Sequence, residues 1–205
     1  MLRHRFTSWF TAAALLMAAC GVAQAQQAPD ALVKQVSNEV LDAAKADKSI
    51  QAGDVGKVMT LVEAKVMPHV NFQRMTSSAV GRYWRQATPE QQKRLQEEFK
   101  TLLVRTYSGA LAQVKDQTVQ LKPLRASPTD TEVVVKTEVR GKGDPIQLDY
   151  RLEKSGDAWK IYDVNVMGIW LVENYRNTFA QEISAGGIDG LIAKLTERNK
   201  ASTKS

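Results

Sequence analysis

Apolar residues follow a helical period in the first half of the chain, alternate with polar residues in the middle, and return to a helical period near the end. Over residues 32–46 they recur at steps of three and four, and they do so again over residues 55–66, ahead of Pro68. A further turn of helix is expected over residues 72–80. Such spacing is typical of helices that bury one face, so the first half of the chain is predicted to be helical.

The clearest helix start is Thr88-Pro-Glu-Gln91. Thr88 can accept a hydrogen bond as the N-cap, Pro89 suits the first helical position, and Gln91 completes a capping box. Behind this start, apolar residues continue at three- and four-residue steps from Leu95 to Val114. The segment is therefore predicted to form one long amphipathic helix.

The apolar period changes to two near Gln117. Four strands separated by turn residues are expected, over residues 119–121, 133–139, 146–153 and 159–166. In the third strand Asp149 alternates with Leu148 and Tyr150, so we expect its carboxylate to face solvent. In the fourth strand the apolar positions change face, which indicates a β-bulge near Asp163.

Two more helices, over residues 169–185 and 188–199, are expected to close the chain, with Gly186-Gly187 as the stop between them. Helices before and after an antiparallel meander indicate an α+β fold, in which a curved four-stranded sheet packs against the N- and C-terminal helices. A curved sheet closed by helices forms a cone with an apolar interior. Whether side chains fill this interior, or leave a cavity, decides which functions are open.

The first 25 residues have the features of an export signal. Arg3 and Arg5 precede an apolar run, and Ala23-Gln-Ala25 matches the site cut by the secretory signal peptidase. A looser lipid-attachment pattern ends at Cys20, the only cysteine of the chain, so an anchored lipoprotein is the alternative. We predict a periplasmic protein with a cleaved signal, one domain and a polar tail, over residues 1–25, 26–199 and 200–205.

Composition and motifs indicate no catalytic or nucleic-acid function. The 28 basic and 22 acidic residues give a net charge of +6 at pH 7, and no basic run is interleaved with aromatics. Outside the signal, His69 is the only histidine, and its place beside Pro68 indicates a structural residue. The sequence has no metal-ligand cluster, serine-nucleophile motif or phosphate-binding loop, so we expect neither a metal nor a cofactor.

One enzymatic alternative remains open at this point. In cone-shaped α+β folds, a carboxylate within an apolar pocket can abstract a proton, because burial adjusts its pKa. Asp163 could act in this way, with Tyr107 or Tyr150 as its partner. The competing interpretation places Asp163 at the surface or at the bulge, with a structural role.

Several stretches resemble the MlaC (toluene-tolerance) family. They are Val70-Asn-Phe-Gln-Arg-Met75, residues 81–91, Leu102-Leu-Val-Arg-Thr-Tyr107, Leu148-Asp-Tyr-Arg151, Trp159-Lys-Ile-Tyr-Asp163 and Asn174-Tyr-Arg176. Together they cover nearly the whole chain after the signal, in the order of the family. Two positions depart from its pattern. Asn71 replaces a common Asp and removes a charge near a possible partner surface, and Trp170 replaces a small Ser and adds bulk beside the expected cavity.

The resemblance implies a soluble phospholipid carrier without enzymatic activity. Members of this family carry phospholipid through the periplasm, between an outer-membrane lipoprotein complex and an inner-membrane ABC-transporter complex, and so maintain outer-membrane asymmetry. A carrier that visits two membranes is expected to be untethered and monomeric, which favours cleavage after Ala25. A protein-binding adaptor with a filled core is the remaining alternative.

Ten apolar or aromatic residues are expected to contact the acyl chains of the lipid: Phe72, Met75, Trp84, Phe99, Leu103, Tyr107, Val135, Leu148, Tyr150 and Val166. The headgroup is expected near water at the open end of the cavity, where Arg82 or Arg105 could contact the phosphate. Each arginine also has a simpler interpretation as a solvated surface charge.

Overall fold

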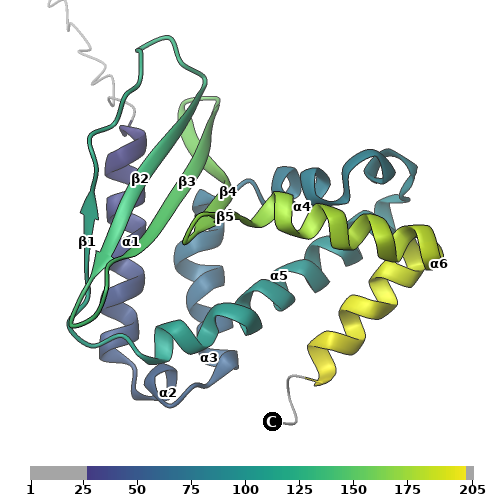
Figure 1. Cartoon of the computed structure of the whole chain (residues 1–205), viewed down its shortest axis with the longest axis horizontal. Helices are drawn as coiled ribbons and strands as arrows, with labels where there is room; N and C mark the ends of the chain where they lie inside the picture. The colour runs from purple at the N-terminus through teal and green to yellow at the C-terminus, as the bar shows by residue number, and fades with distance from the viewer. Residues whose placement is uncertain (1–26, 202–205) are drawn as a thin grey trace, which may run out of the picture.

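The order of helices, sheet and helices expected from the sequence is present in the computed structural model, which describes residues 27–201 (Figure 1). The expected signal peptide, with both of its cleavage patterns, lies outside the described residues, as does most of the polar tail. The described α-helices are α1 (Pro29–Ala46), α2 (Lys48–Gln51), α3 (Val55–Leu61), α4 (Phe72–Val80), α5 (Pro89–Ala112) and α6 (Leu171–Ala201). The sequence pattern did not predict the short α2.

The helix ends follow the local signals of the sequence. At α5 the predicted capping box is present: the N–H of Gln91 donates to Thr88 Oγ1 at 3.2 Å, and the N–H of Thr88 donates to Gln91 Oε1 at 3.0 Å. At the stop predicted in α6, Gly187 has φ 68°, a conformation that favours glycine, and the helix bends there. The two closing helices predicted from the sequence are therefore both present within α6, one on either side of this kink.

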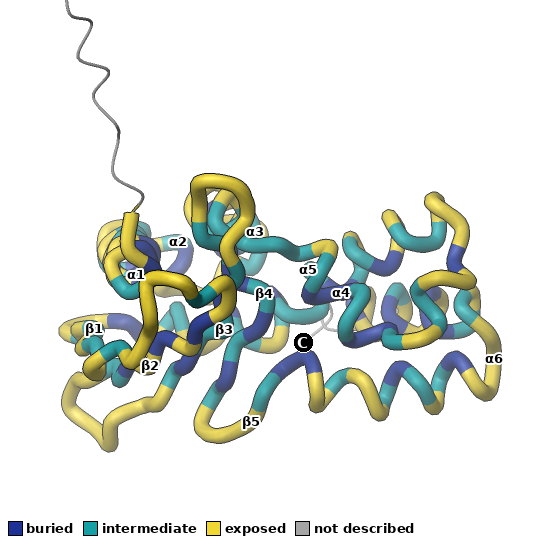
Figure 2. The backbone as a smooth tube through the Cα atoms, turned by 90° about the horizontal axis from the view of Figure 1, so that it is seen from above, coloured by how far each residue is buried: buried dark blue, intermediate teal, exposed yellow. Residues whose placement is uncertain are grey.

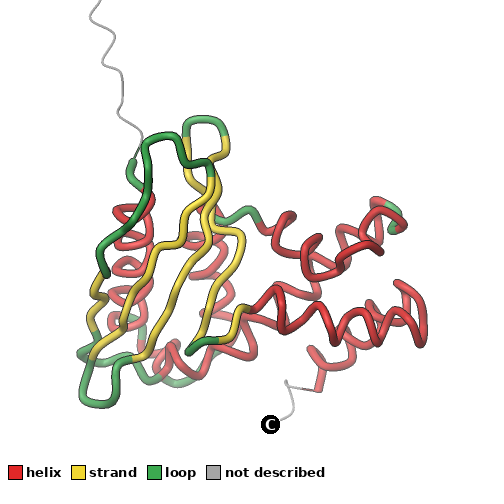
Figure 3. Tube along the Cα trace, turned by 45° about the horizontal axis from the view of Figure 1, so that its top comes forward, coloured by secondary structure: helices red, strands yellow, loops and turns green. Residues whose placement is uncertain are grey.

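The sheet is an antiparallel meander in the order β1-β2-β3-β4-β5 (Figure 3). It has five strands, whereas four were expected. Its strands are β1 (Thr118–Leu121), β2 (Glu132–Arg140), β3 (Ile146–Ser155), β4 (Ala158–Val166) and β5 (Ile169–Trp170). The predicted bulge is confirmed: Arg151 pairs with Asp163 and Leu152 pairs with Ile161, so Tyr162 is the extra residue of β4.

Three clusters of buried side chains hold the fold together. One cluster joins α1 to one face of the sheet, a second joins α1, α2 and α3 to α5, and a third lies among α4, α5 and α6. α1 lies behind the sheet in Figure 1, and the opposite face is turned toward the viewer. We call these the inner and the outer face of the sheet. Single domains usually have one contiguous core. Here the core is divided into three clusters, and we call the regions where two clusters meet junctions.

The prediction that Asp149 is exposed is wrong. Its side chain lies on the outer face but is only 5% exposed. Gln147 donates to Asp149 Oδ2 at 2.7 Å, and no described residue bonds to Oδ1. Asp149 lies between its cross-strand neighbours Lys136 and Asn165, and Asn165, itself 5% exposed, pairs with Trp170 of the unpredicted strand β5. The outer face of β3 is therefore not open to solvent at this point.

Candidate functional site

The inner faces of β3 and β4 form one wall of the junction between the clusters. Tyr150 pairs with Val164, and Leu148 pairs with Val166, so the four side chains lie on the same face of the sheet. All four are half-buried, whereas Leu152, farther along the same face of β3, is completely buried. The apolar wall is therefore only partly covered by the chain's own side chains.

The opposite wall is built from helices and is rich in aromatic rings. The ring of Phe99 in α5 lies 5.8 Å from that of Phe72 in α4. In α6, the rings of Tyr175 and Phe179 lie 5.0 and 5.1 Å from it. Such tilted and edge-on contacts are favourable arrangements of aromatic pairs. They fix α4, α5 and α6 against one another.

The structure places the ten expected acyl-chain residues in different surroundings. Met75, Phe99 and Val135 are buried within clusters, the first two among the helices and Val135 between α1 and the sheet. Half-buried residues pack against the cluster of α4, α5 and α6 or against that of α1 and the sheet; these are Phe72, Trp84, Leu103 and Tyr150. The remaining three residues, Tyr107, Leu148 and Val166, are half-buried. They belong to none of the three clusters and are not among the side chains that pack against a cluster.

Two valines that the sequence analysis did not select connect these walls. Val70 and Val164 each pack against both the helical cluster and the cluster of α1 and the sheet. Val70 forms an isolated parallel bridge with Ile161 just before α4 begins. It lies outside any periodic segment, and the family stretch that begins with it gave it no role. Val164 was visible only as part of the change of face in the fourth strand.

Three tyrosines bring hydroxyl groups to the apolar junction. Burial raises the pKa of Tyr107, of Tyr150 and of Tyr175 above the ordinary value of a phenol. The nearby hydroxyl groups of Ser37 and Thr137 oppose this rise in pKa at Tyr150, and that of Thr106 opposes it at Tyr175. The phenols are therefore neutral at pH 7, and they add no charge to the interior.

Asp163 lies on the face of the sheet opposite to the apolar wall. Its Oδ1 accepts from the N–H groups of Val164, at 2.9 Å, and Val172, at 3.1 Å, and its Oδ2 from Arg151 at 2.9 Å. Its side chain is 1% exposed, and burial raises the pKa of this carboxyl, although the N–H groups and Arg151 oppose the shift. The carboxylate thus caps the start of α6. Among residues 27–201, its hydrogen-bond partners include neither Tyr107 nor Tyr150, one of which the enzymatic alternative requires.

The two residues that depart from the family pattern also have internal partners. Asn71 caps α4 by accepting from the N–H of Arg74 at 3.0 Å, and its amide donates to Glu153 at 2.6 Å. Trp170 does not face the expected cavity, because it pairs with Asn165 on the outer face. There the guanidinium of Arg151 lies 3.8 Å from its ring centroid, a cation–π contact.

The two arginines considered for the headgroup differ in their surroundings. Arg82 is exposed, donates to the hydroxyl of Tyr83 at 2.9 Å, and lies in a surface groove of about 590 Å³ between α4 and α6. Arg105 in α5 is half-buried, and its Nε is buried with no acceptor among the described residues. A buried donor without a partner is unfavourable, so Arg105 is the better placed of the two to receive an anionic group.

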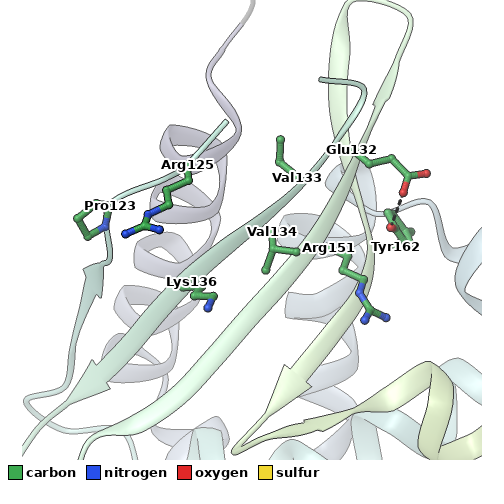
Figure 4. A pocket seen from close by; sticks show the side chains of 8 residues that line it. All are labelled: Pro123, Arg125, Glu132, Val133, Val134, Lys136, Arg151 and Tyr162. Atoms are coloured by element: carbon green, nitrogen blue, oxygen red, sulfur yellow. Dashed lines mark hydrogen bonds between the residues drawn. The ribbon is translucent and has the colours of Figure 1, made fainter. Parts of the chain in front are cut away.

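A second groove crosses the outer face of the sheet (Figure 4). Its volume is about 740 Å³, and Arg125, Lys136 and Arg151 lie around Val134 in it. This groove is open to solvent and lined by charged and apolar side chains alike, so it does not offer an acyl chain the enclosure that the inner face could provide. Among residues 27–201, no group of three His, Cys, Asp or Glu side chains could hold a metal ion. Within the same range no helix is long and apolar enough to cross a membrane.

Comparisons with known proteins agree on one family. The family model described as MlaC protein matches residues 34–197. The toluene tolerance protein ttg2D of Pseudomonas putida is 28% identical over 188 residues, which cover 88% of this chain and 87% of the relative. The intermembrane phospholipid transport system binding protein MlaC of Haemophilus influenzae is 24% identical over 196 residues, 92% of either chain.

A solved structure from Ralstonia solanacearum is similar in both sequence and fold. It is 49% identical to this chain, with a TM-score of 0.83, and the match covers 89% of this chain and all of the other. That protein is described as a phospholipid-binding protein in complex with a phospholipid.

Proposed function

Because the chain belongs to the MlaC family, as the match over residues 34–197 shows, we propose that it is a periplasmic phospholipid carrier that encloses acyl chains between the inner face of its sheet and its helices. The observation that carries this proposal is the incompletely covered apolar junction. Leu148, Val166 and Tyr107 border it without belonging to any of the three clusters. The phospholipid bound by a protein 49% identical to this chain supports the same conclusion.

The physical need for such an enclosure is large. A diacyl phospholipid exposes about 30 methylene groups, and burial of each is worth about 0.8 kcal/mol. Transfer of the bare lipid through water is therefore opposed by a barrier of tens of kcal/mol. A carrier lowers this barrier by replacing the bilayer interior with apolar side chains. It needs neither a nucleophile nor a cofactor for this, and its cargo is the phospholipid.

The headgroup is proposed to remain near water, with its phosphate at Arg105. The guanidinium of Arg105 has a buried Nε without an acceptor, and a phosphate oxygen would supply one. Arg82 is the weaker candidate, since Tyr83 already accepts from its guanidinium. Substitution of Arg105 by Gln should therefore weaken phospholipid binding more than the same substitution of Arg82.

The proposed route follows from the family. We propose that the protein, released from its signal after Ala25, shuttles as a monomer between an outer-membrane lipoprotein complex and an inner-membrane ABC-transporter complex, and so helps to maintain outer-membrane asymmetry. The mass of the intact exported protein would distinguish this form from a lipoprotein anchored at Cys20.

The direct test is mass spectrometry of lipids extracted from natively purified protein. We expect about one phospholipid per chain or fewer, and a protein that carries none would favour the adaptor with a filled core. Leu148→Trp and Val166→Trp should lower lipid content, because they add bulk to half-buried walls. Val134→Trp, on the outer face, is the matched control and should retain its lipid. Val135→Trp is less suitable, because Val135 is fully buried and overpacking there destabilises the fold.

A further inference from the structure

The apolar inner face of β3 continues into solvent at one end of the sheet. Leu152, Tyr150, Leu148 and Ile146 alternate along β3 and therefore lie on the same face. Leu152 is 0% exposed, the next two are half-buried, and Ile146 is 43% exposed. On β3, the inner face therefore remains apolar up to the first residue of the strand, Ile146.

β4 and β5 show the same change at the same end. Ile161 is 4% exposed, Val164 and Val166 are half-buried, and Ile169 is 57% exposed. Ile169 pairs with Val166, so it extends the same face. Met167, in the turn between β4 and β5, is 69% exposed, and its N–H donates to the carbonyl of Gln147 at 3.0 Å. This bond ties the turn to the start of β3, and the turn itself is exposed next to β5 (Figure 2).

Three of the four large apolar side chains exposed in residues 27–201 are therefore gathered in one place: Ile146, Met167 and Ile169. Exposed apolar side chains gathered in one patch often mark an interaction site. Met167 has φ 51°, a left-handed conformation that a side chain other than glycine rarely adopts. The fold thus presents an apolar side chain at the tip of a strained turn, where a polar residue would be better solvated.

We propose that this end of the sheet is the mouth of the lipid cavity, and that Ile146, Met167 and Ile169 form an apolar lip that enters the surface of a phospholipid bilayer during loading. The inference rests on the proposed function, because the lip gains its role from the cavity behind it. An acyl chain that leaves the bilayer would pass from Met167 and Ile169 to Val166 and Leu148 without crossing water.

A bilayer fits this patch better than a charged protein partner. The lip continues directly into the half-buried wall that is proposed to bind acyl chains, and all three of its side chains are apolar. The adjoining loop between β2 and β3 carries Lys142 and Asp144, whose charges cancel. The contact should therefore depend on insertion of apolar side chains, and it should respond weakly to salt.

Insertion can be measured with one environment-sensitive label. The only cysteine of the chain is Cys20, ahead of the expected cleavage site, so Met167→Cys provides a single thiol in a chain that begins at Gln26. With a nitrobenzoxadiazole label at this thiol, emission should shift to the blue on mixing with vesicles of phosphatidylethanolamine and phosphatidylglycerol. The label at Val134→Cys, which is 40% exposed on the outer face, is the matched control and should not shift.

The role in loading needs a second measurement. Met167→Gln combined with Ile169→Thr should slow uptake of pyrene-labelled phospholipid from the same vesicles about tenfold, equivalent to about 1.4 kcal/mol. Val134→Thr should load at the wild-type rate. The final lipid content of the double variant should equal that of wild type, because its cavity wall is unchanged.

The outcomes separate this inference from the proposed function. Natively purified protein that carries no phospholipid would count against the carrier itself, whereas wild-type protein that carries lipid but takes up none from vesicles would refute the lip alone. A double variant that loads from vesicles at the wild-type rate would refute the lip alone, and slower loading only from a protein donor would assign the patch to a protein partner. Equal slowing by Val134→Thr would also refute the lip, because any exposed apolar residue would then serve.

Discussion

Asp163 offers a prediction that separates a structural from a catalytic role. In the Asp163→Ala variant, two backbone N–H groups and the guanidinium of Arg151 lose their shared acceptor. Loss of one partner of a buried ion pair typically costs about 3–5 kcal/mol. The side chain of Arg151 is 35% exposed and remains stacked on Trp170, so we expect the lower limit, about 3 kcal/mol.

Asp163→Asn should cost much less, about 1 kcal/mol. The Asn carbonyl oxygen can still accept from the N–H groups of Val164 and Val172 at the start of α6. The charge itself contributes little net stability, because burial raises the pKa of Asp163 and so opposes its ionisation. A folded-state pKa above the unfolded value means that the folded chain binds the proton more tightly. The stability that the bound proton contributes is therefore present below the ordinary carboxyl pKa, and it is lost as pH rises through the raised pKa of Asp163.

Urea unfolding of lipid-free protein would measure these differences, since bound lipid would add its own stabilisation. Asp157→Asn, in the exposed turn between β3 and β4, is the matched control and should change the free energy of unfolding by less than about 0.5 kcal/mol. Equal losses for Asp163→Ala and Asp163→Asn, or no loss in either, would refute the capping role. A pH-dependent turnover abolished by Asp163→Asn without loss of stability would favour the enzyme.

Two further substitutions test the local structure. Thr88→Ala removes one half of the capping box of α5 and should lower the free energy of unfolding by about 1 kcal/mol, measured by urea titration; an unchanged midpoint would show that the cap is dispensable. Asn71→Asp replaces the amide donor to Glu153 with a second carboxylate and should lower the melting temperature at pH 7 and low salt, and by less at high salt, which screens the repulsion. A loss of melting temperature that does not depend on salt would contradict this account.

The local elements of this protein were predictable because their signals lie within a few residues of one another. The capping box at Thr88, the helix stop at Gly187 and the bulge near Asp163 were each identified from periodicity or turn chemistry. The α+β architecture followed from the order of helical and alternating segments, and the family from motifs that cover most of the chain.

The face on which a polar side chain lies was less accessible to sequence analysis. Asp149 alternates with apolar neighbours and was expected in water, but it is buried beside Asn165, which pairs with Trp170 of β5. A two-residue strand leaves no periodic signal. Because Trp170 is part of this strand and pairs with Asn165, it lies on the outer face and not in the expected cavity.

What the sequence determined by itself was the inventory: amphipathic helices, an alternating meander, an apolar set large enough for a cavity or a core, and few groups suited to catalysis. Tertiary structure decided how that set is divided. Hydrophobic burial is non-directional, so an apolar pattern specifies which side chains leave water but not which side chains they meet. Only the folded chain separates Val135, which is completely buried, from Val166, which is half-buried, and from Met167, which reaches solvent.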